Sequence, residues 1–138
     1  MSIDKEFPSG ERQSDAPFAT DRRILVVDDD EDIRLFLADR LEHLGFLTCL
    51  ASNGMEGLTL LRERSFCGVL LDLEMPVLDG LTMLNQLRQE SHAVPVIVMS
   101  AHQTHTTMIK AIEAGAKDFL TKPIADVILK YKCLRLFS

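Results

Sequence analysis

Short apolar runs alternate with segments of helical periodicity from residue 24 onward, and this alternation restricts the fold more than any other feature. The first run, Ile24-Leu25-Val26-Val27, is continuously apolar, as expected for a strand covered on both faces. Apolar residues then recur at helical spacing from Ile33 to Leu44, and Gly45 follows as a helix stop. Strict alternation of this kind predicts a parallel sheet with helices on both faces.

The same strand-then-helix pattern continues along the chain. Further strands are predicted over Phe46 to Ala51, Gly68 to Asp72, Val96 to Met99 and Lys117 to Thr121. Helices are indicated after them by Met55, Leu58 and Leu61, by Leu81, Leu84 and Leu87 behind the cap Asp79, by Ile109, Ile112 and Ala114, and by Val127, Ile128, Tyr131 and Leu134. We therefore expect an α/β fold, a doubly wound five-stranded parallel sheet, as one domain over residues 23–138. Residues 1–22 are polar without periodicity and predict a flexible N-terminal tail.

Composition narrows the functions open to this domain. The net charge of -6 argues against a surface that binds nucleic acid directly, because such a surface needs a basic stripe. The cysteines Cys49, Cys67 and Cys133 lack the spacing of metal ligands and are interpreted as small core residues in a reducing compartment. No apolar run reaches membrane-spanning length, so we expect a cytoplasmic protein without a membrane partner.

Polar residues suited to phosphate or a metal ion stand at the ends of four predicted strands. Asp28 and Asp29 follow the first strand, Asp72 ends the third, Ser100 follows the fourth, and Lys122 follows the fifth. The carboxyl ends of parallel strands lie along one rim of the sheet, where open α/β sheets bind their ligands. A single polar residue at the end of a strand would mean little. An acid pair, a further acid, a hydroxyl and an ammonium at four strand ends together predict a site for phosphate or a metal ion.

Phosphoryl transfer to a carboxylate is the chemistry that these groups suit. Three carboxylates at close range repel one another, and a divalent cation is the usual remedy. Oxygen ligands without a nearby histidine or cysteine favour Mg²⁺ over zinc or iron. A carboxylate is a competent nucleophile for making an acyl phosphate, while the metal and a lysine stabilise the spread negative charge.

Four motifs resemble the receiver domain of two-component response regulators, the CheY-like family. They are Val26-Val27-Asp28-Asp29, Asp72-Leu73-Glu74-Met75-Pro76-Val77-Leu78-Asp79-Gly80, Ser100-Ala101, and Gly115-Ala116-Lys117-Asp118-Phe119-Leu120-Thr121-Lys122-Pro123. The intervals of 43, 28 and 22 residues between Asp29, Asp72, Ser100 and Lys122 also fit that family, and the similarity covers residues 24–136. The resemblance implies the sheet order 2-1-3-4-5.

The resemblance also implies a role for each rim residue. Asp72 would be the phosphoacceptor. The Mg²⁺ ligands would be Asp28 (through water), Asp29, Asp72 and the backbone carbonyl of Glu74. Ser100 and Lys122 would contact the phosphoryl group as catalytic and phosphate-sensing residues, Phe119 would be the aromatic switch, and the Lys122–Pro123 peptide bond would be cis.

A signalling module, not an enzyme acting on other molecules, is the function that follows from the resemblance. The phosphoryl donor would be a histidine kinase or a histidine phosphotransfer protein. The face made by the fourth helix, fifth strand and fifth helix would then control a downstream protein or a fused output domain, and homodimerisation stays open. Glu74 and His102 would flank the path of the attacking water. We hypothesise that they tune dephosphorylation, and replacing both by small residues should then change the lifetime of the phosphoryl group.

Two other classes use related chemistry or a related fold. A haloacid-dehalogenase-like Mg²⁺-dependent phosphatase would place an aspartate two residues after its nucleophile, where this chain has Glu74, and would carry an inserted cap. A flavin carrier would need a phosphate-binding loop after the first strand, where Asp28-Asp29-Asp30 would repel a flavin phosphate. The phosphatase is the stronger alternative.

Overall fold

Five parallel strands form one sheet in a computed structural model that describes residues 22–102 and 104–138. The strands are β2 (Arg23–Val27), β3 (Leu47–Ala51), β4 (Gly68–Asp72), β5 (Val96–Ser100) and β6 (Asp118–Thr121). Their order is β3-β2-β4-β5-β6, which confirms the predicted 2-1-3-4-5 arrangement. The predicted tail lies outside the described residues except for Arg22.

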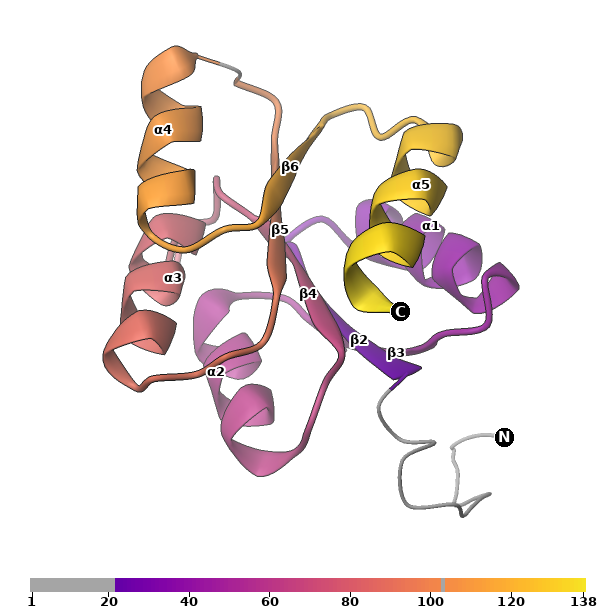
Figure 1. The fold of residues 1–138 in the computed structure, drawn as a ribbon, viewed down its shortest axis with the longest axis horizontal. Helices are drawn as coiled ribbons and strands as arrows, with labels where there is room; N and C mark the ends of the chain where they lie inside the picture. The colour runs from indigo at the N-terminus through magenta and orange to yellow at the C-terminus, as the bar shows by residue number, and fades with distance from the viewer. Residues whose placement is uncertain (1–21, 103) are drawn as a thin grey trace.

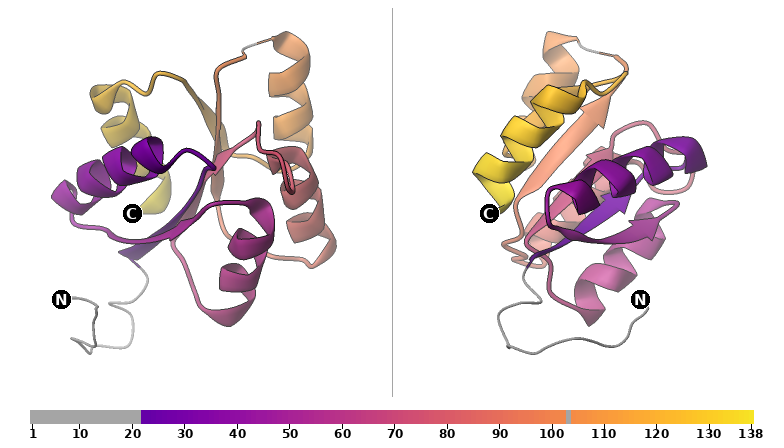
Figure 2. Two further views of the ribbon diagram at one scale, coloured as in Figure 1. Left: turned by 180° about the vertical axis from the view of Figure 1, so that it is seen from behind. Right: turned by 90° about the vertical axis from the view of Figure 1, so that its right-hand side faces the viewer.

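Helices cover both faces of the sheet, as the alternation predicts (Figures 1 and 2). They are α1 (Glu31–His43), α2 (Gly54–Glu63), α3 (Gly80–Gln89), α4 (His105–Glu113) and α5 (Asp126–Phe137). Figure 1 views the sheet nearly edge-on, with α2, α3 and α4 on one side and α1 and α5 on the other. Each side holds its own buried apolar cluster. Among the described residues, no helix combines the length and apolar character needed to cross a membrane.

Side-chain caps start several helices close to the carboxyl ends of the strands. Asp30 accepts hydrogen bonds from the backbone amides of Asp32 and Ile33 and so begins α1, and Asp79 accepts from Thr82 and begins α3. The acidic residues after β2 therefore have two different roles. Asp30 caps α1, whereas Asp28 and Asp29 are left to form the rim at the carboxyl end of the strand.

The exposed side of α5 carries the apolar residues that indicated this helix. Val127 and Tyr131 are 71% and 63% exposed, whereas the core is filled by Leu129, Cys133 and Phe137. Periodicity gives a helix and its apolar stripes, but the sheet decides which stripe is buried. Burial raises the pKa of the Cys133 thiol to about 12, so this cysteine is an unreactive core residue.

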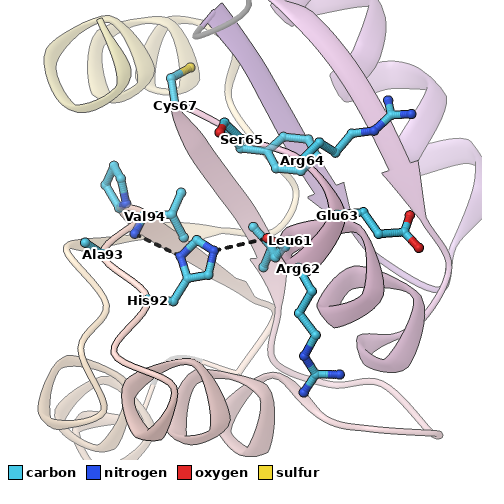
Figure 3. Close-up of a pocket in the computed structure, with 11 residues that line it drawn as sticks. Leu61, Arg62, Glu63, Arg64, Ser65, Cys67, His92, Ala93 and Val94 are labelled. Carbon is cyan, nitrogen blue, oxygen red and sulfur yellow. Dashed lines mark hydrogen bonds between the residues drawn. The ribbon is translucent and has the colours of Figure 1, made fainter.

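A pocket of about 530 Å³ lies at the amino ends of the strands, away from the polar residues that follow them, and is lined by residues that precede β4 and β5 (Figure 3). His92 fills one wall, where its Nδ1 accepts from the Val94 amide at 3.4 Å and its Nε2 donates to the Leu61 carbonyl at 3.2 Å. The guanidinium groups of Arg62 and Arg64 point to different sides of the pocket. His92 thus ties the end of α2 to the loop before β5, while Arg62 pairs with Glu90 and Arg64 contacts the Cys49 sulfur, so these groups do not converge on a common ligand position.

Candidate functional site

Two buried aspartates meet at the carboxyl ends of neighbouring strands. Asp28 follows β2 directly and Asp72 is the last residue of β4, and these strands pair in parallel up to Val27 and Leu71. Asp28 is fully buried and Asp72 is 1% exposed. Asp29 is exposed, yet carboxylate oxygens of Asp28, Asp29 and Asp72 lie within 4.8 Å of one another. Strand pairing thus brings together the three acids that the sequence singled out.

Lys122 supplies the positive charge at this rim. It follows β6, and its backbone amide donates a hydrogen bond to the Ser100 carbonyl. The side-chain nitrogen Nζ lies 2.9 Å from Asp28 Oδ2 and 3.2 Å from Asp72 Oδ2. The Lys122–Pro123 peptide bond is cis. Asp28 Oδ2 is buried and accepts no well-oriented hydrogen bond from any described residue, so its charge is met electrostatically.

The protonation of Asp72 reflects this crowded environment. Burial raises the pKa of Asp72 to about 7, and the neighbouring Asp28 carboxylate acts in the same direction. The Glu74 amide, which donates to Asp72 Oδ1 at 3.0 Å, and the Lys122 ammonium only partly oppose that rise. Burial also acts to lower the pKa of Lys122, but both carboxylates outweigh it and the pKa of Lys122 stays above its ordinary value.

The acid cluster has the properties of a site for a divalent cation. It offers three carboxylates, two of them buried, and one buried oxygen that no described hydrogen-bond donor satisfies. Among the described residues, the ammonium of Lys122 is the one cation that forms an ion pair with Asp28 and Asp72, and a hard cation with oxygen ligands would stabilise the remaining negative charge. The residues present therefore fit a bound divalent metal.

Ser100 lies at the same rim but is engaged by Glu74. The Ser100 hydroxyl donates to Glu74 Oε2, and the Ala101 amide donates to Glu74 Oε1 at 3.3 Å. His102 Nδ1 is 4.0 Å from Glu74 Oε1. The family resemblance implied only that the backbone carbonyl of Glu74 would lie at the rim and that its side chain would flank the path of the attacking water. Nothing in the pattern of the chain indicated a side-chain contact between two separate loops.

Phe119 is half-buried on β6 and is contacted by Lys132 of α5. The ammonium of Lys132 lies 4.6 Å from the centre of the Phe119 ring, and it donates to the Phe119 carbonyl at 2.7 Å and to Asp118 at 3.0 Å. A pocket of about 350 Å³ borders the ring on the α4 side, between Met108, Ile109 and Ile112. Sequence reasoning missed Lys132, because a single lysine on a helix gives no local signal of what it will contact.

Comparison with known protein families identifies this arrangement. The family described as the response regulator receiver domain matches residues 24–132. The chain belongs to the response regulator receiver family. All the rim residues of this receiver domain, from Asp28 to Lys122, fall within the matched region.

Individual relatives of the receiver agree with this assignment. It is 38% identical over 117 residues to the transcriptional regulatory protein PrrA of Mycobacterium tuberculosis, covering 83% of this chain and 50% of that protein. It is also similar to the transcriptional regulatory protein SrrA of Staphylococcus aureus, at 36% identity over 113 residues, 80% of this chain and 46% of that protein. The chain thus spans about half the length of these curated relatives.

Solved structures show the same likeness. The receiver domain of the Francisella response regulator 1452 superposes with a TM-score of 0.80 at 33% identity, over 83% of this chain and 95% of that one. The receiver domain of NtrX from Brucella abortus superposes with a TM-score of 0.76 at 34% identity, over 83% of this chain and 97% of that one. These relatives give no support to the phosphatase alternative.

Proposed function

We propose that this receiver accepts a phosphoryl group on Asp72 from a histidine kinase or a histidine phosphotransfer protein, in a reaction that requires Mg²⁺. The observation that carries the proposal is the surroundings of Asp72. It is a buried carboxylate 3.2 Å from the Lys122 ammonium, in a cluster with two further acids. An ordinary structural aspartate would not be placed among like charges in this way.

Each residue of the site has a part in this reaction. A carboxylate oxygen of Asp72 attacks phosphorus, the bond from phosphorus to the donor nitrogen breaks, and the imidazole leaves with the bonding electrons and takes up a proton. Lys122 offsets the charge that spreads over the phosphoryl oxygens. Asp28 and Asp29, with Asp72 and the Glu74 carbonyl, would hold Mg²⁺, which when bound neutralises charge on the phosphoryl oxygens. Ser100 donates its hydroxyl proton to the phosphoryl group after transfer.

Intact-mass measurement after incubation with acetyl phosphate and Mg²⁺ tests the proposal. The wild-type chain should gain the mass of one phosphoryl group. Asp72→Asn should gain none, because an amide is not a competent nucleophile. Asp79→Asn, a matched control that keeps a capping oxygen at the start of α3, should be modified like the wild type. Steady hydrolysis of phosphate esters without a lasting modification would contradict the proposal and favour a phosphatase.

The affinity for Mg²⁺ should depend on pH near neutrality. Because the pKa of Asp72 is raised to about 7 in the metal-free site, protons compete with the metal below that pH. We expect affinity to fall about tenfold for each pH unit below about 7 and to level off above it. Titration calorimetry at pH 6, 7 and 8 measures this change. Equal affinities at the three values would show that Asp72 stays ionised throughout.

The same raised pKa sets the sign of a stability effect in the metal-free protein. The folded-state pKa of Asp72 lies above its unfolded value, so the contribution of Asp72 to stability is present below about pH 4 and is lost as pH rises through about 7. Saturating Mg²⁺ should reverse that loss, because the metal binds the ionised, folded form. Thermal unfolding at pH 5 and pH 8, with and without Mg²⁺, measures both changes.

The face made by α4, β6 and α5 is the proposed route of the signal. It exposes a set of large apolar side chains, namely Ile109, Ile112, Val127, Ile128 and Tyr131. Such a surface suits contact with another protein, whether a fused output domain, a separate downstream protein or a second copy of the chain. Phe119 joins this face to the rim, since it lies on β6, the strand that Lys122 directly follows. We place the protein in the cytoplasm and assign it no reaction beyond its own phosphorylation and dephosphorylation.

A further inference from the structure

The side chain of Glu74 connects two loops at the rim of the sheet. Glu74 follows β4, while its carboxylate contacts residues at and after the end of β5. There Oε2 accepts from the Ser100 hydroxyl, and Oε1 accepts from the Ala101 amide at 3.3 Å. Two successive donors at the end of β5 therefore face one anion.

Ser100 has a single hydroxyl proton to donate. Its Oγ also lies 3.0 Å from the His102 carbonyl, but a carboxylate is the stronger acceptor because it is charged. A phosphoryl group on Asp72 would bring a charge of about -1.5 to -2 and three acceptor oxygens. Glu74 and the phosphoryl group thus need the same proton, and they repel each other as well.

Burial indicates which of the two partners can move. Ser100 is 7% exposed, and its hydroxyl lies among the Glu74 carboxylate and the backbone of His102. The Glu74 side chain is 39% exposed, so its carboxylate has water to turn into. The Glu74 backbone can stay in place meanwhile, because its amide is anchored on Asp72 Oδ1 at 3.0 Å.

We propose that Glu74 is a built-in competitor of the phosphoryl group. In the resting state its carboxylate occupies the Ser100 hydroxyl and the Ala101 amide and holds the end of β5 in place. Phosphorylation of Asp72 has to displace this carboxylate before Ser100 can turn to the phosphoryl group. Glu74 is accordingly a positioning residue that opposes the switch, and this inference rests on the proposed function of Asp72.

Beryllium fluoride with Mg²⁺ probes the competition directly, since it forms a phosphoryl-like anion on a carboxylate without group transfer. Its affinity can be followed by the backbone NMR signal of Ala101. Removing a charge-assisted competitor should tighten binding about tenfold in Glu74→Ala and by less in Glu74→Gln, which keeps an uncharged acceptor. Glu63→Ala removes an exposed charge at the end of α2, far from the rim, and should bind like the wild type.

A second background separates competition for Ser100 from simple charge repulsion. In Ser100→Ala the shared hydroxyl proton is gone, so the gain from Glu74→Ala should shrink to about twofold or less. The inference would be overturned if Glu74→Ala raised the affinity for beryllium fluoride equally in both backgrounds, or in neither. The proposed function would still stand in that case, provided that the wild-type chain binds beryllium fluoride. Failure of the wild-type chain to bind beryllium fluoride would overturn the proposed function, and this inference with it.

Discussion

Lys122→Met is expected to slow phosphorylation by acetyl phosphate about 10²-fold, the usual loss when one donor to a developing oxyanion is removed. The Lys122 ammonium is 2.9 Å and 3.2 Å from the carboxylates of Asp28 and Asp72, and it reaches the rim from the end of a different strand. Methionine keeps most of the volume of the side chain but supplies no charge. Intact-mass time courses with saturating Mg²⁺ measure the rate.

The same variant should be less stable without metal. It removes the one cation that, among the described residues, forms an ion pair with the buried carboxylates of Asp28 and Asp72. Removing one partner of a buried ion pair costs about 3 kcal/mol of the free energy of unfolding. Mg²⁺ should recover much of this loss, and should bind more tightly than to the wild type because no ammonium competes for Asp28 and Asp72. Urea unfolding with and without Mg²⁺ tests both points.

The control for this prediction is Lys130→Met, which removes an exposed lysine from α5 and should change neither the rate nor the stability. Lys122→Arg should keep more stability than Lys122→Met, because it retains a positive charge. A phosphorylation rate for Lys122→Met within about threefold of the wild type would show that the lysine is only a structural counterion, since loss of an oxyanion donor costs far more.

Gly80→Ala should lower the free energy of unfolding by roughly 2–3 kcal/mol, at the upper end for overpacking. A Cβ atom at Gly80 would stand 2.5 Å from the Asp72 carbonyl oxygen and 2.8 Å from the Leu73 Cα. Both are backbone atoms of the segment that carries the proposed phosphoacceptor, so neither can move without displacing Asp72. We therefore expect weaker Mg²⁺ binding together with lower stability.

Gly57→Ala is the matched comparison for this change. There the Cβ would meet the terminal methyl of Met83 at 3.0 Å and a methyl of Val27 at 3.1 Å. The flexible end of Met83 can yield, the approach to Val27 calls for a shift of only a few tenths of an ångström, and alanine gains up to about 1 kcal/mol of helix propensity over glycine. Urea unfolding should place Gly57→Ala near the wild type. If Gly80→Ala were equally mild, the loop after β4 would be more adaptable than its close backbone contacts indicate.

The fold and the meeting of the acids could be predicted from the sequence for a simple physical reason. Parallel strands all end on one rim, so residues that end β2, β4, β5 and β6 have to share it. Continuous apolar runs gave the strands, and the type and order of the residues after them gave the chemistry. Asp28, Asp72 and Lys122 follow from this rule almost without tertiary information.

Contacts between side chains from different elements could not be predicted in the same way. The carboxylate of Glu74 reaches Ser100 across two loops, and the ammonium of Lys132 reaches Phe119 from α5. Each depends on a rotamer and on how far apart the elements pack, and neither leaves a period or a spacing in the sequence. The buried stripe of α5 was hidden for a related reason, because that helix is apolar on more than one side.

The charge balance at the rim gives Lys122 a further role. When all three carboxylates are ionised, they and the Lys122 ammonium together carry two negative charges, which is the charge that one divalent cation cancels. On our proposal, the resting site is balanced when the metal is bound, and phosphorylation tips it by up to one negative charge. Hydrogen-bond donors near the site then reorient to stabilise that added charge. Lys122 and the metal together bring the net charge of the resting site to zero, so the domain responds to the one charge that phosphorylation adds.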